Sequence, residues 1–134
     1  MINIQNIEDM KWETRTGHSK KFNCWGATQF ALGMRKKFAW VSEQVMLKWI
    51  DKNTTPVTDE VTPGDILILK SSLGTLFHTA VYLGNNNWFH KLGSCETTFS
   101  EKEEIIKGYF KDPSSAQILI HRLKKTNKVQ QLAA

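Results

Sequence analysis

The chain of 134 residues is long enough for one domain with its own core, and a composition that is 40% apolar with five tryptophans excludes a disordered protein. Its net charge of +5 suits an anionic partner, but the lysines are not interleaved with aromatic residues, so we expect no nucleic-acid partner. Two cysteines, without CxxC or Cys/His finger spacing, exclude a disulfide framework and a zinc finger.

The N-terminal stretch MINIQNIEDMKWE carries acidic residues and no apolar block, so it does not have the pattern of a secretory signal. No run approaches the roughly 20 apolar residues that a membrane span needs. We therefore expect a cytoplasmic protein, one exported by a secretion system that needs no signal peptide, or a domain of a longer protein. The pattern predicts a single domain over 1–134, in which about 124–134 form a basic and polar tail.

The first third of the chain predicts helices. Residues 1–22 predict an irregular or weakly helical segment. Asn23 is a favourable N-cap for a helix over 24–37, in which Gly33 is either internal or marks a bend. Apolar residues at helical spacing predict a second helix over 40–52, with Trp40 in the core.

Strand patterns dominate the rest of the chain. After a polar connector, runs rich in β-branched and aromatic residues predict strands over 65–70, 78–84, 87–92 and 116–123. The asparagines at 85–87 predict a hairpin turn, since asparagine tolerates positive φ. Ser100 and Glu103 have capping-box spacing for a short helix over 100–110. Helices followed by strands predict an α+β fold, with helices packed on one face of an antiparallel sheet.

Three residues could supply the chemistry of a cysteine hydrolase, which needs a thiolate, a base and a group that orients the base. Cys24 begins a predicted helix, where the partial positive charge of the helix end lowers a thiol pKa. His78 opens a predicted strand as the candidate base and later acid, and His90 follows 12 residues later as the orienting group. The two histidines share a face only if the turn has the right parity, which the sequence leaves open. The alternative is that Cys24 is a small packing residue.

Several short motifs then occur in one order along the chain. Trp12 stands twelve residues before Cys24, and Phe-Asn-Cys-Trp-Gly surrounds the cysteine. A Pro-Gly-Asp-Ile-Leu entry to a strand, a His-Thr-Ala-Val-Tyr-Leu-Gly segment, a Trp-Phe-His segment and a final strand with arginine follow, at 63–67, 78–84, 88–90 and 118–122. This order and these spacings resemble the NlpC family of papain-like cysteine peptidases, which cleave cell-wall peptides.

The resemblance implies a papain-like fold in which the Cys24 helix packs on a central antiparallel sheet, with His78 and His90 facing the cysteine. It implies that Cys24, His78 and His90 form a catalytic triad, with the Cys24 N–H among the donors to the oxyanion. It also implies hydrolysis of amide bonds, most directly as a peptidoglycan stem-peptide endopeptidase or amidase. The resemblance and the sequence indicate no cofactor and no metal.

The substrate-binding positions depart from the family pattern. Trp12, Asn23 and Trp25 stand where relatives often have a tyrosine, an aspartate and a serine that line the site and read the free amino end of the peptide. We predict that these three residues contact the substrate, but an asparagine lacks the charge that would pair with an ammonium group. The departures leave open an acyltransferase, a lipid hydrolase or a protein deamidase on the same fold. A non-catalytic binding module is a further alternative.

Size and the absent signal pattern suggest how such a domain could be used. A bare catalytic domain without a secretory signal is consistent with a secreted effector or a toxin domain. A bacterium that makes such a protein would need an immunity or inhibitor protein as a partner. These expectations rest on no motif.

Overall fold

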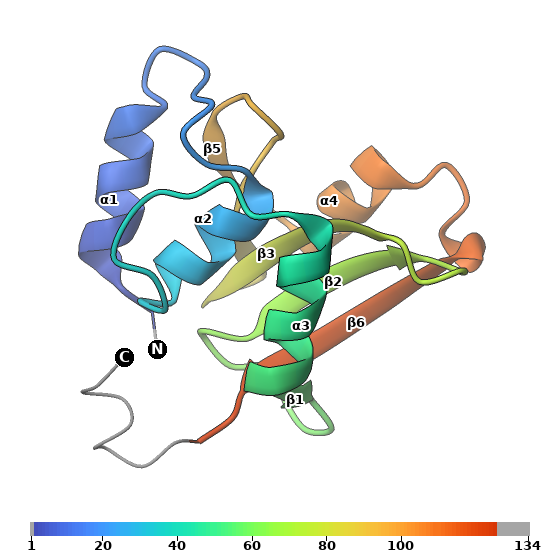
Figure 1. Cartoon of the computed structure of the whole chain (residues 1–134). Coiled ribbons are helices and arrows are strands. Elements are labelled where there is room, and N and C mark those ends of the chain that lie inside the picture. Colours follow the sequence, from blue (N-terminus) through green and yellow to red (C-terminus); the bar gives the residue numbers. More distant parts are fainter. Residues whose placement is uncertain (1, 126–134) are drawn as a thin grey trace.

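The computed structural model describes residues 2–125, so most of the predicted 124–134 tail lies outside the described residues. The helices are α1 (Ile4–Glu13), α2 (Cys24–Ala31), α3 (Glu43–Asn53) and α4 (Lys102–Tyr109), with a 3-10 turn at Pro113–Ser115. The strands are β1 (Thr54–Pro56), β2 (Ile66–Ser71), β3 (Leu76–Gly84), β4 (Asn87–Lys91), β5 (Thr97–Ser100) and β6 (Ala116–Leu123). Figure 1 shows α2 and α3 in front of the sheet, α1 to the left beside α2, and α4 behind the sheet.

The strands form one antiparallel sheet in the order β1-β6-β2-β3-β4-β5, which confirms the predicted α+β class. The four predicted strands are its central members. The two edge strands, β1 and β5, were not predicted. Both are short and rich in threonine, and β1 ends on Pro56, a residue that sheets tolerate at an edge.

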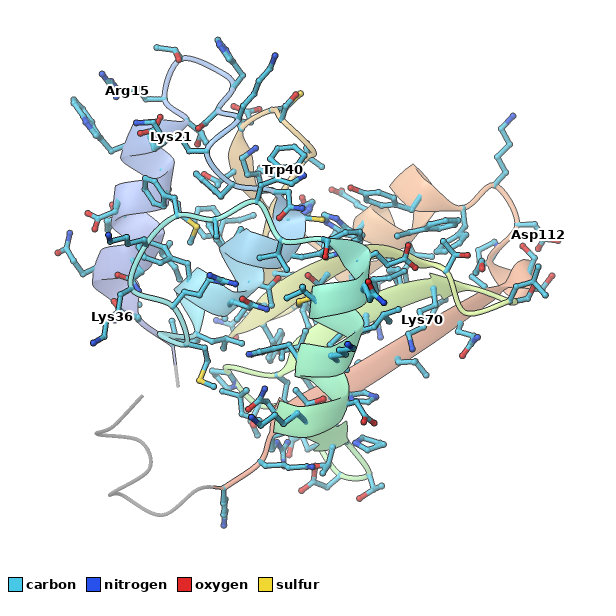
Figure 2. The ribbon with its side chains drawn as sticks, viewed as in Figure 1. Arg15, Lys21, Lys36, Trp40, Lys70 and Asp112 are labelled. Carbon is cyan, nitrogen blue, oxygen red and sulfur yellow. The ribbon has the colours of Figure 1, made fainter. Side chains whose placement is uncertain are left out.

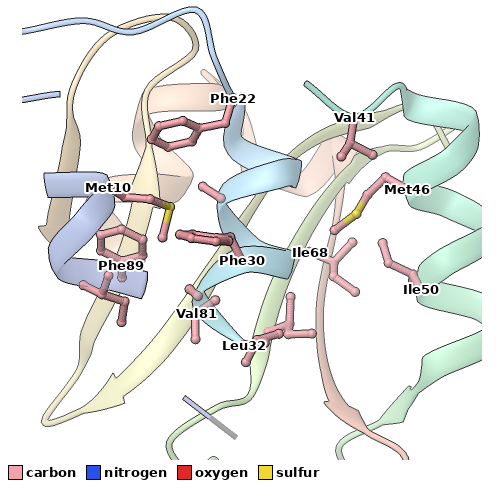
Figure 3. Close-up of a cluster of buried hydrophobic side chains, with 14 of the residues drawn as sticks. Met10, Phe22, Phe30, Leu32, Val41, Met46, Ile50, Ile68, Val81 and Phe89 are labelled. Atoms are coloured by element: carbon pink, nitrogen blue, oxygen red, sulfur yellow. The ribbon is translucent and has the colours of Figure 1, made fainter. Parts of the chain in front are cut away.

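Alternation along the strands gives each face of the sheet its own apolar cluster. Ile66 and Ile68 of β2 pack with α1, α2 and α3, and Figure 3 shows part of this cluster around Phe30 and Met46. The neighbouring residues of β2 pack on the opposite face against Ile105 of α4. The three N-terminal helices therefore share one face, as predicted, whereas α4 covers the other.

Helix α1 corrects the prediction of an irregular or weakly helical start. Its side chains bury little area, with only Ile7 and Met10 inside, so the apolar pattern in the sequence is weak. Asn3 caps the helix by accepting a hydrogen bond from the backbone N–H of Asn6. Packing of the buried side chains against α2 stabilises a helix that local pattern alone does not indicate.

The next two helices are shorter than predicted. Helix α2 ends at Ala31, and Gly33 lies just beyond it with φ of 70°, so the glycine terminates the helix. Helix α3 begins only at Glu43, because Ser42 is its N-cap and accepts from the Val45 N–H. Trp40 therefore lies in the connecting loop, and with 56% of its surface exposed it is not the core residue that the helical pattern predicted.

The Pro-Gly-Asp motif has a structural role at the start of β2. The buried carboxylate of Asp65 accepts two hydrogen bonds from Arg122 on β6, at 2.9 and 3.0 Å, and a third from the Thr62 N–H. A bidentate pair of this kind fixes geometry as well as contributing energy. The motif therefore locks the entry of one central strand to the end of its neighbour.

Candidate active site

Cys24 is the first residue of α2 and is almost enclosed, with 8% of its surface exposed. The buried side chain of Asn23 caps the helix, with Oδ1 accepting from the Gly26 N–H at 2.9 Å. The same amide accepts from the Val41 N–H and donates to the Val41 carbonyl at 2.7 Å. Asn23 thus anchors the start of α2 to the loop before α3 and fixes the backbone that carries the thiol.

The hairpin between β3 and β4 decides the parity that the sequence left open. Asn85 and Asn86 have φ of 53° and 52°, as the predicted turn requires. The turn sets Gly84 opposite Asn87, and a register shift between Tyr82 and Gly84 then sets Tyr82 opposite Trp88, so even-numbered residues of both strands share a face. The paired register ends at Val81 and Phe89, before the two histidines are reached. The two strands are therefore no longer paired to each other where their histidines project.

His78 and His90 are in direct contact on this shared face. His78 Nε2 lies 2.9 Å from His90 Nδ1, and His90 Nε2 lies 3.0 Å from the hydroxyl of Ser100 at the end of β5. The other ring nitrogen of His78, Nδ1, is buried and has no hydrogen-bond partner within residues 2–125. The pair therefore leaves one imidazole nitrogen of His78 available for a reacting group.

The aromatic ring of Tyr109, at the end of α4, stacks on His78 with 4.3 Å between ring centroids and 20° between the planes. Burial raises the pKa of the Tyr109 phenol, and the nearby Cys24 thiol raises it further. The hydroxyl of Thr79, the residue that follows His78, lies 3.5 Å from the carbonyl oxygen of Cys24, and the backbone N–H of Thr79 lowers the pKa of the Cys24 thiol. Cys24 therefore lies near Tyr109 and the start of β3, and no direct hydrogen bond joins Cys24 to His78 among the described residues.

Burial dominates the protonation of the site. It raises the pKa of Cys24 to about 11, against the lowering effects of the backbone donors of Thr79, Trp25 and Cys24 itself. It lowers the pKa of His78 to about 3, with His90 contributing, and the pKa of His90 to about 4. The predicted depressed thiol pKa is therefore wrong for this state, because desolvation outweighs the helix end. At neutral pH the resting site holds a thiol and neutral imidazoles.

The three residues predicted to contact the substrate lie in different environments. Asn23 uses its side chain to bond backbone groups of Gly26 and Val41. Trp25, beside the thiol, is half-buried, and its indole N–H has no partner in the described part of the chain. Trp12, in the last turn of α1, is 67% exposed and stacks with the guanidinium of Arg15 at 3.8 Å. Their contact with a substrate stays a prediction.

A tight backbone crossing lies on α2, the helix that begins with Cys24, and an open cleft lies along the loop before this helix. A Cβ placed on Gly26 would lie 1.9 Å from the carbonyl oxygen of Ala39, so only glycine fits where the loop crosses α2. Figure 2 shows Trp40 on this loop and Arg15 and Lys21 on the loop before α2. An open cleft of about 600 Å³ is lined by Glu13, Arg15, Thr16, His18, Ser19, Lys20 and Lys21.

Sequence reasoning missed two residues of the site, Ser100 and Tyr109. Ser100 was interpreted as a helix cap, but the N-cap of α4 is Glu101, which makes no capping hydrogen bond through its side chain. Tyr109 carries no local signal, because only the fold brings the end of α4 against His78. Within residues 2–125, no group of three or more histidine, cysteine, aspartate or glutamate side chains has the arrangement of a metal site.

The α+β fold, with a cysteine at a helix N-terminus and a bonded histidine pair on adjacent antiparallel strands, fits the class of papain-like cysteine hydrolases. The chain belongs to the NlpC/P60 family, whose profile matches residues 9–114, and the predicted resemblance is thereby confirmed.

The fold is similar to the crystal structure of an NLP/P60-family protein, described as similar to lipoprotein, from Staphylococcus aureus subsp. aureus Mu50. The TM-score is 0.51 at 13% sequence identity, and the match covers 92% of this chain and 43% of that chain. This chain therefore spans less than half the length of that protein. No curated protein matches the chain. No helix in residues 2–125 is long and apolar enough to cross a membrane.

Proposed function

We propose that this protein hydrolyses amide bonds in peptidoglycan stem peptides, with Cys24 as nucleophile, His78 as base and later acid, and His90 as the orienting group. The observation that supports this most is the unpartnered Nδ1 of His78, on a ring held by His90 from one edge and by Tyr109 from one face. An imidazole that is held at one edge and on one face, with one ring nitrogen free, is suited to move a proton at that nitrogen.

The reaction begins with transfer of the thiol proton of Cys24 to His78 Nδ1 as the sulfur attacks the carbonyl carbon. The carbonyl oxygen becomes an oxyanion, for which the free N–H groups of the first turn of α2 are candidate donors. His78 then gives the proton to the departing amine, the C–N bond breaks, and a thioester remains. His78 next takes a proton from water, which attacks the thioester carbonyl. The C–S bond then breaks, His78 returns the proton to the sulfur of Cys24, and the carboxylic acid leaves.

The elevated thiol pKa shapes this proposal. Because the resting thiol is neutral, proton transfer and attack are coupled rather than sequential, and the base must be correctly oriented before the substrate binds. The positive end of α2 and the Thr79 donor then stabilise negative charge on sulfur as it develops. Orientation of His78 is therefore the property on which activity depends most.

A different substrate on the same fold is the second candidate, and Asn23 favours it. The position that relatives use for a charged contact to a peptide amine holds a neutral amide that already bonds Gly26 and Val41. An acyl group without a free amine, as in lipid hydrolysis, acyl transfer or protein deamidation, needs no such charge. The effector or toxin role and an immunity partner remain predictions from the sequence.

Incubation with purified peptidoglycan, followed by mass spectrometry of the released products, tests the proposal. The wild type should release stem-peptide fragments, Cys24→Ala should release none, and Cys95→Ser should match the wild type because Cys95 is the exposed cysteine. Phospholipid vesicles in a parallel incubation test the second candidate. Peptide release that persists in Cys24→Ala would refute the assigned nucleophile, and release of fatty acid alone would replace the proposed substrate.

A further inference from the structure

Ser100 ends a chain of three bonded side chains that begins at the reacting nitrogen. His78 Nε2 contacts His90 Nδ1 at 2.9 Å, and His90 Nε2 contacts the Ser100 hydroxyl at 3.0 Å. His90 therefore uses one ring nitrogen for each of its two neighbours, and His78 uses Nε2 for His90 and leaves Nδ1 free. In such a chain the position of one proton determines the position of the next.

Only one direction of this chain allows His78 to act as a base. For Nδ1 of His78 to have a free lone pair, its Nε2 must carry the proton and donate to His90 Nδ1. His90 is then protonated at Nε2 and donates to the Ser100 oxygen. In the reverse direction Ser100 donates to His90, His90 donates to His78, and His78 Nδ1 carries a proton that blocks transfer from the thiol.

The fold holds Ser100 in place for this contact and gives its hydroxyl no other described partner. The backbone of Ser100 is opposite Trp88 in the β4–β5 ladder, which fixes the serine next to the strand that carries His90. The residue has capping-box spacing to Glu103, yet α4 is capped at Glu101 without a side-chain hydrogen bond. The hydroxyl that the sequence assigns to a helix end is instead directed to the second histidine.

We propose that Ser100 is a positioning residue that sets the tautomers of His90 and His78 by accepting the hydrogen bond from His90 Nε2. This inference rests on the proposed function of His78 as base. It assigns the serine no contact with substrate and no share in bond making. Its effect passes through His90 to the nitrogen that receives the thiol proton.

The test uses an isosteric pair, Ser100→Thr and Ser100→Val, which differ in one hydroxyl and suit a strand position. In ¹⁵N-histidine NMR spectra the wild type and Ser100→Thr should show both rings protonated at Nε2. Ser100→Val should show mixed tautomers for both. Thr97→Ala, which removes a hydroxyl of the same strand that bonds Thr14 at 3.0 Å, is the matched control and should keep the wild-type histidine signals.

Alkylation of Cys24 by iodoacetamide, in a Cys95→Ser background, adds a rate that does not depend on the substrate. Ser100→Val should react about three- to tenfold more slowly than the wild type, the factor expected for one hydrogen bond, and Ser100→Thr within about twofold. Equal rates and equal histidine spectra for the threonine and valine variants would overturn the inference. Peptide cleavage is scored separately, so loss of the proposed substrate leaves this result intact, and a failed serine test leaves the Cys24→Ala test of hydrolysis intact.

Discussion

The structure predicts that Asn23→Asp damages the protein rather than restoring a family contact. The asparagine accepts hydrogen bonds through Oδ1 from two backbone N–H groups, those of Gly26 and Val41, and an aspartate can keep both. The amide group of Asn23 also donates to the Val41 carbonyl at 2.7 Å. A carboxylate has no such donor, so the substitution sets one acceptor against another in a site where residue 23 is 6% exposed.

The magnitude follows from two opposing effects. A buried carbonyl left without its donor costs about 1–3 kcal/mol. A negative charge at a helix N-terminus stabilises the folded state by about 0.3–1 kcal/mol. We therefore expect the free energy of unfolding to fall by about 1–2 kcal/mol. The carboxylate also lies next to Cys24, where its charge opposes ionisation of the thiol and slows alkylation.

Urea denaturation of Asn23→Asp and Asn3→Asp measures the effect with a matched control. Asn3 caps α1 and is exposed, and its side chain accepts from the Asn6 N–H, so an aspartate there loses no described bond. Asn3→Asp should be neutral or slightly stabilising. If Asn23→Asp is as stable as the control, the bond to the Val41 carbonyl is unimportant. Faster cleavage of peptides with a free amino end, but not of acetylated ones, would show instead that residue 23 reads that end.

Three further predictions concern the histidine pair and the buried ion pair. The pKa of His78 is about 3 in the folded protein and about 6.5 in an unfolded chain. Between these two pH values the unfolded state therefore binds more protons than the folded state. The free energy of unfolding should therefore fall as pH drops from about 6.5 to 4, by up to about 1.4 kcal/mol per pH unit for this histidine. Urea denaturation at a series of pH values should show that the free energy of unfolding of His78→Gln depends less steeply on pH than that of the wild type. His90→Asn and His90→Gln should retain more peptide cleavage than His90→Ala, since another polar group can orient an imidazole, and equal total loss in all three would mean a direct chemical role. Asp65→Asn should lower the free energy of unfolding by about 1–3 kcal/mol because it breaks the bidentate contact with Arg122, whereas Asp59→Asn, at the exposed carboxylate of the same arginine, should cost less than about 1 kcal/mol; equal costs would place the stabilisation at the surface.

The family and the sheet could be predicted because they depend on local pattern. The hairpin at 85–86 needed residues that accept positive φ, and asparagine supplies them. The Pro-Gly-Asp motif and the spacing of 12 residues from His78 to His90 each lie within one short stretch of sequence, so both can be identified without the fold. The sequence predicted only an irregular or weakly helical segment at α1, because a helix with two buried side chains leaves a weak apolar pattern and is stabilised by packing.

The protonation of the site could not be predicted from sequence, because it depends on enclosure by distant segments. The helix end at Cys24 is visible in the sequence and favours a thiolate. The burial that opposes it, with 8% of Cys24 exposed, is a property of the assembled fold. Ser100 shows the same limit, since its spacing fits a cap and only the β4–β5 register directs its hydroxyl to His90.

The crossing of the loop between α2 and α3 over α2 distinguishes a position that tolerates substitution from one that does not. Main-chain groups of the loop attach it to the start of α2. The Ala39 carbonyl lies against Gly26, and the N–H and carbonyl groups of Val41 bond the side chain of Asn23. The side chain of Trp40, between these two anchors, takes no part in this attachment and is 56% exposed. Position 40 can therefore vary without breaking the attachment of this loop to the start of α2, whereas position 26 admits no side chain. Sequence change at position 40 therefore leaves the backbone around Cys24 undisturbed.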